Sequence, residues 1–129
     1  MLEREGICII DDDTDLLTLF SDALKSSGFR TTGFNDPVEA IEYLRKHHNE
    51  FGLVVTDWRM PKMDGSVIIK LISQTDPSIG IMMISAFDFD DEELHEITKE
   101  DFLQKPIHIE QFIETIRQKV TPIYEICVG

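Results

Sequence analysis

Cysteine, cationic side chains and long apolar runs are all scarce in this sequence, and each scarcity excludes a class of protein. Two cysteines among 129 residues cannot build the disulfide framework of a small secreted scaffold, and their spacing matches no metal-binding pattern. A reducing compartment is therefore expected, with Cys8 as a small buried hydrophobe. No apolar stretch approaches the ~18 residues that a membrane-spanning helix needs. The N-terminal segment is not typical of a signal peptide, so we expect a cytoplasmic protein without membrane insertion.

Positive charge is outnumbered by negative charge. The chain holds 12 Lys and Arg against 25 Asp and Glu, which gives a formal net charge of −13. Nucleic-acid binding depends on clustered cations that neutralise phosphates, so no direct contact with DNA or RNA is expected. An anionic membrane surface is disfavoured for the same reason. A divalent cation or a basic patch on a partner suits this charge better.

The sequence does contain apolar runs that alternate with amphipathic segments over the length of one domain. Hydrophobic residues make up 42% of the chain, which is enough for a packed core and too much for disorder. Strands are predicted at 6–11, 30–34, 53–57, 79–85 and 101–105, and helices at 14–27, 37–46, from 65, within 90–98 and at 109–120. This alternation indicates an α/β fold, a parallel sheet with helices on both faces. We expect one domain over residues 1–121 and a short tail at 122–129.

The second helix has the clearest start signal. Asp36 can cap it, Pro37 suits its first turn, and Glu39 can complete a capping box. Val38, Ile41 and Leu44 are expected to face the core.

Polar side chains follow the apolar runs that are predicted to be strands. Asp11 and Asp12 follow the first run, Asp57 ends the third, Ser85 ends the fourth, and Lys105 follows the fifth. The carboxyl ends of parallel strands share the edge at which open α/β sheets bind ligands. If the strands lie side by side, these acids, the hydroxyl and the cation meet at one place.

Together these side chains have the chemistry of a metal-assisted phosphoryl-transfer site. Carboxylates this close cannot share a dry pocket without a cation, and Mg²⁺ prefers oxygen ligands of this kind. Lys105 can hold one phosphate oxygen and Ser85 can hydrogen-bond to another. Asp57 can act as the nucleophile and form an aspartyl phosphate. Taken singly, the acids suit a helix start and the others are ordinary surface or strand-end residues, but their joint arrangement favours the functional interpretation.

The motifs around these residues give the chain a family resemblance. The segment Asp57–Gly65 reads Asp-Trp-Arg-Met-Pro-Lys-Met-Asp-Gly, and it matches the Asp-x-x-Met-Pro-x-Met-Asp-Gly pattern of response-regulator receiver domains at every fixed position. Asp11-Asp12, Ser85-Ala86 and Lys105-Pro106 complete that family's active-site set. The chain resembles a receiver domain of two-component signalling systems over nearly its whole length. The resemblance implies a three-layer αβα, flavodoxin-like, doubly wound sheet of five parallel strands in the order 2-1-3-4-5.

The resemblance also implies roles for single residues. Asp57 would accept a phosphoryl group from the phosphohistidine of a sensor histidine kinase or a phosphotransfer protein. Asp12 and Asp57 would ligate Mg²⁺ together with the backbone carbonyl of Arg59, and Asp11 would act largely through metal-bound water. Asp13 is expected to cap the first helix. The chain would be a signalling phosphoprotein whose only catalysis is its own phosphorylation and dephosphorylation.

A switch is implied as well. Phosphorylation would draw Ser85 towards the phosphate, and the aromatic side chain of Phe102 would turn inward. Phe87 and Arg59 lie two positions after Ser85 and Asp57, where they are expected to tune the attack of water. Switched contacts with a downstream protein target would carry the output.

The sequence departs from the family after Ser85. Only 20 positions separate Ser85 from Lys105, which is fewer than the family usually has. The segment 87–93 is unusually acidic and aromatic, and Lys99-Glu100 replaces the usual Gly-Ala before the fifth strand. A shortened fourth helix is expected, and the family's usual mode of dimerisation is not assumed, so a homodimer stays open.

Two other functions compete with this interpretation. Asp11-Asp12-Asp13-Thr14 also fits the Asp-x-Asp-x-Thr motif of haloacid-dehalogenase-type phosphatases, with Asp11 as nucleophile and Asp13 as acid and base. That family needs a further acidic pair after the lysine, where this sequence offers only Glu110 and Glu114. A receiver-like interaction module that no longer takes phosphate is the other alternative, and the complete residue set argues against it. The kinase, the target, and whether the chain stands alone or belongs to a longer regulator stay open.

Overall fold

Five parallel strands form one sheet in the order β2-β1-β3-β4-β5, as expected. The computed structural model describes residues 5–58, 60–85, 102–104 and 107–120. The strands, in chain order, are β1 (Gly6–Ile10), β2 (Thr31–Phe34), β3 (Phe51–Asp57), β4 (Gly80–Ser85) and β5 (Phe102–Gln104). The helices are α1 (Thr14–Ser26), α2 (Pro37–His47), α3 (Gly65–Thr75) and α4 (Ile109–Lys119), with a short 3₁₀ turn, η2 (His48–Glu50), after α2.

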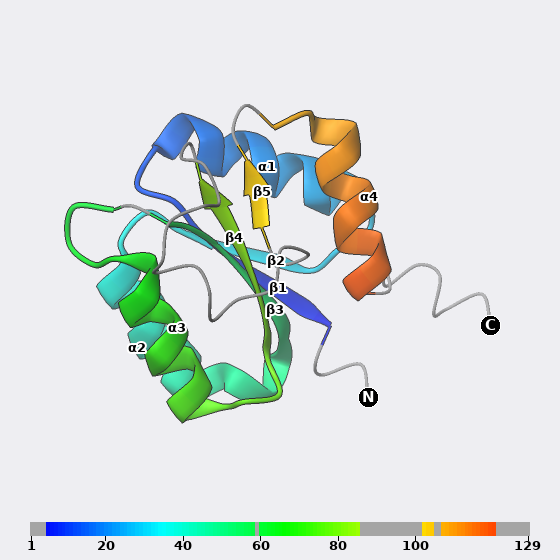
Figure 1. Ribbon diagram of the computed structural model, residues 1–129. Coiled ribbons are helices and arrows are strands. Elements are labelled where there is room, and N and C mark those ends of the chain that lie inside the picture. Colours follow the sequence, from blue (N-terminus) through cyan, green and yellow to red (C-terminus); the bar gives the residue numbers. More distant parts are fainter. Residues whose placement is uncertain (1–4, 59, 86–101, 105–106, 121–129) are drawn as a thin grey trace.

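The helices cover the sheet in pairs, with α1 and α4 on one face and α2 and α3 on the other (Figure 1). Alternate residues of the central strands supply the two cores, because successive side chains of a strand point to opposite faces. In β1, Ile7 and Ile9 pack with the α1 and α4 side, whereas Cys8 and Ile10 pack with the α2 and α3 side. A strand buried on both faces needs a continuous apolar run, which is why this segment does not alternate with polar residues.

Burial also settles the chemistry of Cys8. Its side chain is fully buried, and this burial raises the pKa of the thiol above its ordinary range. A thiol that stays protonated is a poor nucleophile and metal ligand. Cys8 is therefore the inert core residue that the sequence predicted.

Helix starts follow the capping signals of the sequence. The Asp13 carboxylate accepts hydrogen bonds from the backbone N–H of Asp15 at 3.0 Å and of Leu16 at 3.3 Å, so the prediction that it caps the first helix is confirmed. The Asp36 carboxylate likewise accepts from the N–H of Val38 at 2.9 Å and caps α2. After α1 the chain turns at Gly28, whose φ of 95° favours glycine.

One prediction about α2 was wrong, because Val38 does not face the core. Its side chain is 42% exposed, whereas Ala40, Ile41 and Leu44 are buried. Each residue advances ~100° around a helix, so Val38, three positions before Ile41, lies about 60° beyond the edge of the stripe formed by the buried residues. Other boundaries differ slightly from the prediction, since β3 begins at Phe51 rather than at residue 53.

Several predictions fall on residues outside the described ranges. They are the helix within 90–98 and the tail at 122–129, whereas the last helix, predicted at 109–120, is described and ends at Lys119. The domain boundary at residue 121 therefore stays a prediction. No helix in the described part of the chain combines the length and the apolar character required to cross a bilayer.

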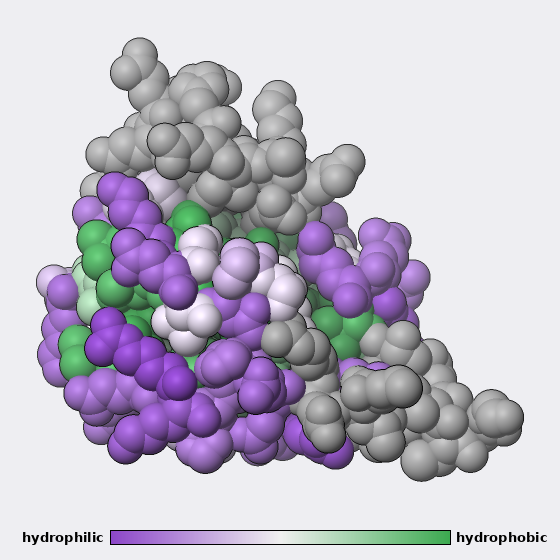
Figure 2. Space-filling view, turned by 90° about the horizontal axis from the view of Figure 1, so that it is seen from below, coloured by the Kyte–Doolittle hydropathy of each residue, from purple (hydrophilic) through white to green (hydrophobic). Residues whose placement is uncertain are grey.

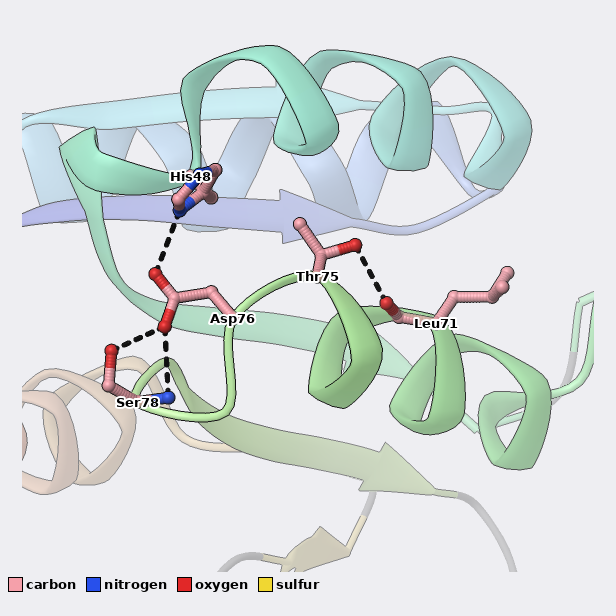
Figure 3. A network of polar contacts seen from close by, with 5 residues as sticks. All are labelled: His48, Leu71, Thr75, Asp76 and Ser78. Atoms are coloured by element: carbon pink, nitrogen blue, oxygen red, sulfur yellow. Dashed lines mark hydrogen bonds and ion pairs between the residues drawn. The ribbon is translucent and has the colours of Figure 1, made fainter.

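A buried carboxylate joins two turns at the amino ends of the strands (Figure 3). Asp76 follows α3, and its side chain is only 9% exposed. One of its oxygens lies 2.9 Å from Nδ1 of His48, in the turn before β3. The other accepts hydrogen bonds from the N–H of Ser78 at 3.0 Å and from its hydroxyl at 2.6 Å, just before β4. Asp76 thus ties together the entries into two neighbouring strands.

The surface at this end of the molecule is largely hydrophilic. Figure 2 looks onto it from below in the view of Figure 1, and hydrophobic residues show only in small areas between hydrophilic ones. The described residues of this face therefore present no broad apolar surface. The polar side chains with functional chemistry gather at the opposite edge of the sheet.

Candidate functional site

Three carboxylates meet where β1 and β3 end. Each of Asp11, Asp12 and Asp57 offers one oxygen, and these oxygens all lie within 4.8 Å of one another. The pairing of Ile10 with Thr56 in the parallel register brings the two strand ends together. Asp11 and Asp57 are 2% and 9% exposed, and Asp12 is exposed. Among the described residues this is the one group of three or more potential metal ligands with such spacing.

The geometry of this acidic cluster, Asp11, Asp12 and Asp57, fits a small hard cation. Mg²⁺ holds oxygen ligands at ~2.1 Å, so that opposite ligands lie ~4.2 Å apart, close to the observed limit of 4.8 Å. One oxygen of Asp11 is held in position, because it accepts a hydrogen bond from the backbone N–H of Asp13 at 3.0 Å. The donor types, their spacing and the open side at Asp12 together suit an ion that keeps several waters.

The backbone of the neighbouring strands follows the predicted arrangement. Asp57 pairs with Ile84 on β4, and the N–H of Trp58 donates to the carbonyl of Ile84 at 2.9 Å. Ser85 is the next residue of β4, so its backbone stands at the same edge as Asp57. Phe102 is placed in β5 opposite Met83. The side chains of Ser85 and Phe102 are not described, and Arg59, Phe87 and Lys105 lie outside the described residues.

The loop after Asp57 closes tightly against the sheet. The N–H of Gly65 donates to the carbonyl of Trp58 at 2.7 Å, and the buried Trp58 side chain packs on Met83 of β4. A Cβ added at Gly65 would lie 2.6 Å from Cε3 of Trp58 and would also overlap Cε of Met83. The glycine of the motif is therefore needed because two side chains occupy the space next to it.

Replacing Gly65 with Ala is expected to lower the free energy of unfolding by ~1–3 kcal/mol, the usual cost of forcing extra volume into a packed site. Equilibrium urea denaturation measures this change. Gly33→Ala is the comparison variant. A Cβ added at Gly33 would lie 3.0 Å from the nearest side chains, which is a longer distance than the one to Trp58 at Gly65. Equal stability of Gly65→Ala and the parent protein would contradict the packing argument.

An ion pair that could not be predicted from the sequence connects the same loop to the start of α2. Nζ of Lys62 lies 3.0 Å from the Asp36 carboxylate, and this hydrogen bond, with that from Val38, lowers the pKa of Asp36. Asp36 thus caps α2 and also contacts the loop between β3 and α3. Linear spacing gives no signal for this pair, since the contact exists only once β2 and β3 flank β1.

Comparison with known proteins decides the family. The family model described as "Response regulator receiver domain" matches residues 7–117. The chain belongs to the response regulator receiver domain family. This assignment supports the phosphoacceptor interpretation and not the haloacid-dehalogenase one. The latter also needs Asp13 as acid and base, whereas its carboxylate caps α1.

The relatives are regulators of similar or greater length. The polar-differentiation response regulator DivK of Brucella ovis is 27% identical over 117 residues, covering 88% of this chain and 94% of DivK. The phosphoglycerate transport system transcriptional regulatory protein PgtA of Salmonella typhimurium is 34% identical over 110 residues, which is 83% of this chain but 26% of PgtA. A receiver domain can therefore match a protein of its own size or one part of a larger regulator.

Solved structures agree with this assignment. A response regulator receiver protein from Sinorhizobium medicae WSM419 is 28% identical, with a TM-score of 0.78 over 92% of this chain and 95% of that one. A CheX-CheY-BeF3-Mg+2 complex from Borrelia burgdorferi contains a chain 26% identical to this one, with a TM-score of 0.74 over 88% of this chain and 87% of that one. The expected sheet order and the receiver fold are confirmed.

Addition of Mg²⁺ is expected to change the fluorescence of Trp58, the only tryptophan. This residue follows Asp57 directly and is 3% exposed, so a charge bound at the acidic cluster alters its surroundings. A fluorescence titration into the millimolar range should saturate, and Asp12→Asn should shift it to higher concentration. A flat titration of the folded protein would argue against the proposed ligands.

Proposed function

We propose that Asp57 is the phosphoacceptor of this receiver domain and that the acidic cluster holds the Mg²⁺ that phosphorylation requires. The observation that carries the proposal is the convergence of the Asp11, Asp12 and Asp57 oxygens within 4.8 Å. In this assignment Asp12 and Asp57 ligate the ion with the backbone carbonyl of Arg59. Asp11 contributes largely through bound water.

The reaction is a displacement at phosphorus. An Asp57 oxygen attacks the phosphorus of a phosphohistidine, an O–P bond forms, and the N–P bond breaks with its electron pair left on the imidazole. When bound, Mg²⁺ would offset the negative charge gathered on the phosphoryl oxygens. The low exposure of Asp57, 9%, supports a site in which fixed groups rather than bulk water surround the acceptor.

The remaining residues of the site have roles in recognition and switching. Lys105 supplies a positive charge to one phosphoryl oxygen, and Ser85 supplies a hydroxyl to another once the group is attached. Phe102 turns inward as Ser85 moves, which changes the surface presented to a target. Arg59 and Phe87 control the approach of the water that removes the phosphoryl group.

The partners follow from this chemistry. A sensor histidine kinase or a phosphotransfer protein supplies the phosphoryl group in the cytoplasm, and a downstream protein reads the phosphorylated surface. The chain adds and removes its own phosphoryl group and is not an enzyme acting on a separate substrate. The resemblance of the fold to a receiver in a CheX-CheY-BeF3-Mg+2 complex supports both the metal and the protein contact.

Intact-mass measurement tests the proposal. Incubation with a small acyl phosphate and Mg²⁺ should add one phosphoryl group per chain, and chelation of Mg²⁺ should prevent the addition. Failure to gain any mass at high donor concentration, with the protein folded and Mg²⁺ bound, would favour the interaction module that takes no phosphate.

A further inference from the structure

A groove of about 340 Å³ lies between the edge strand β2 and the outward side of α2. It is lined by Phe34, Glu39, Glu42, Tyr43, Lys46 and His47. β2 is the terminal strand of the sheet order, so this part of the surface belongs to the side of the domain remote from β5. None of the lining residues belongs to the acidic cluster or to the switch.

The groove contains a row of aromatic rings that is already held in place. The Tyr43 ring lies 5.4 Å from that of Phe34 and is stacked on that of His47, with centroids 4.2 Å apart. Nδ1 of His47 also lies 2.8 Å from the carboxylate of Glu50, which orients the ring. Binding of a ligand that stacks on this row costs little side-chain conformational entropy, because the side chains are preorganised.

The charges around the row favour a cation. Glu39 and Glu42 line the groove with Lys46 as the opposing charge, so the three give one net negative charge, and all three are exposed. The chain as a whole carries −13, which would repel an anion and attract a basic partner. Aromatic faces attract cations through their quadrupole, which acts in the same direction.

We propose that this groove receives an arginine side chain from a basic segment of a partner protein. The guanidinium is planar and can stack on the Tyr43 row while its N–H groups reach Glu39 or Glu42. A lysine ammonium is a compact, strongly hydrated point charge and uses the rings less well. The volume of about 340 Å³ is at the lower end for a small-molecule pocket, which suits one long side chain and its neighbours.

The test is an NMR titration of the full chain with acetyl-tetraarginine amide, run beside acetyl-tetralysine amide at low salt. Backbone signals of 34 and 39–47 should shift most. Glu39→Gln/Glu42→Gln should weaken tetraarginine binding by about fivefold, the sum of two exposed charge contacts. The matched control Asp22→Asn/Glu114→Gln removes the same charge from exposed sites on α1 and α4 and should change binding less than about 1.5-fold, as expected for a general field effect.

Tyr43→Leu separates stacking from charge. It should remove most of the preference for tetraarginine over tetralysine, a factor of about two to five for an exposed cation–π contact. Equal weakening by the two double variants would overturn the proposal, since a diffuse acidic surface would then explain binding. Indole shifting the same signals while tetraarginine does not would also overturn it. Phosphorylation at Asp57 should be unchanged in all these variants, so this proposal and the phosphoacceptor assignment fail separately.

Discussion

Asp57→Asn is expected to abolish the gain of a phosphoryl group from a small acyl phosphate. The amide has nearly the shape of the carboxylate but lacks the anionic oxygen that attacks phosphorus. Intact-mass measurement after incubation with the donor and Mg²⁺ shows the loss. Asp22→Asn, which removes an exposed carboxylate on α1, is the matched control and should take up one phosphoryl group like the parent protein.

Asp11→Asn distinguishes the two chemistries that the sequence allowed. In the receiver assignment this change weakens Mg²⁺ binding, so labelling slows but still reaches Asp57 at high Mg²⁺. In the phosphatase alternative Asp11 is the nucleophile, and its replacement removes labelling altogether. Phosphoryl incorporation that persists in Asp57→Asn and vanishes in Asp11→Asn would contradict the assignment of Asp57 as the phosphoacceptor.

Asp76→Ala is expected to lower the free energy of unfolding by ~1–3 kcal/mol. The substitution leaves three partners of a buried carboxylate without their acceptor, namely His48 Nδ1, the Ser78 N–H and the Ser78 hydroxyl (Figure 3). A polar group that stays buried without a partner costs ~1–3 kcal/mol, and the sum is smaller here because Ser78 is exposed and His48 is only partly buried, so water reaches both. Urea denaturation monitored by circular dichroism gives the value.

Thr75→Ala is the matched control for this effect. Its hydroxyl donates at 2.8 Å to the carbonyl of Leu71 within the same helix end, and such a bond back into the helix adds little stability. The change should therefore stay near ~0.5 kcal/mol, as for most surface substitutions. If Asp76→Ala costs no more than Thr75→Ala, the network does not hold the two turns together.

The sequence predicted those features that depend on local pattern. Continuous apolar runs identified the buried strands, and Asp13 and Asp36 marked helix starts by a capping chemistry that acts over two or three residues. The acidic cluster could also be predicted, because strand ends of a parallel sheet necessarily share an edge. Asp11, Asp12 and Asp57 are at that edge, as expected.

Features that depend on which turns become neighbours could not be predicted. Lys62 and Asp36 are 26 residues apart in the chain, and His48 and Asp76 are 28 apart. Neither distance matches a local motif, so each contact exists only after the strands have assembled. Val38 shows that a local pattern can also give a wrong prediction, because an apolar residue near a helix start does not have to face the core. The roles of Ser85, Phe102, Lys105, Arg59 and Phe87 stay predictions.

The position of the phosphoryl group in the chain without substitutions is the most direct test of Asp57 as the phosphoacceptor. The chain is phosphorylated with a small acyl phosphate and Mg²⁺. The aspartyl phosphate formed on the protein is then reduced with borohydride, and the peptides are mapped by mass spectrometry. If Asp57 is the phosphoacceptor, the reduced residue is Asp57 alone. Modification of Asp11, or of any residue other than Asp57, would contradict this assignment.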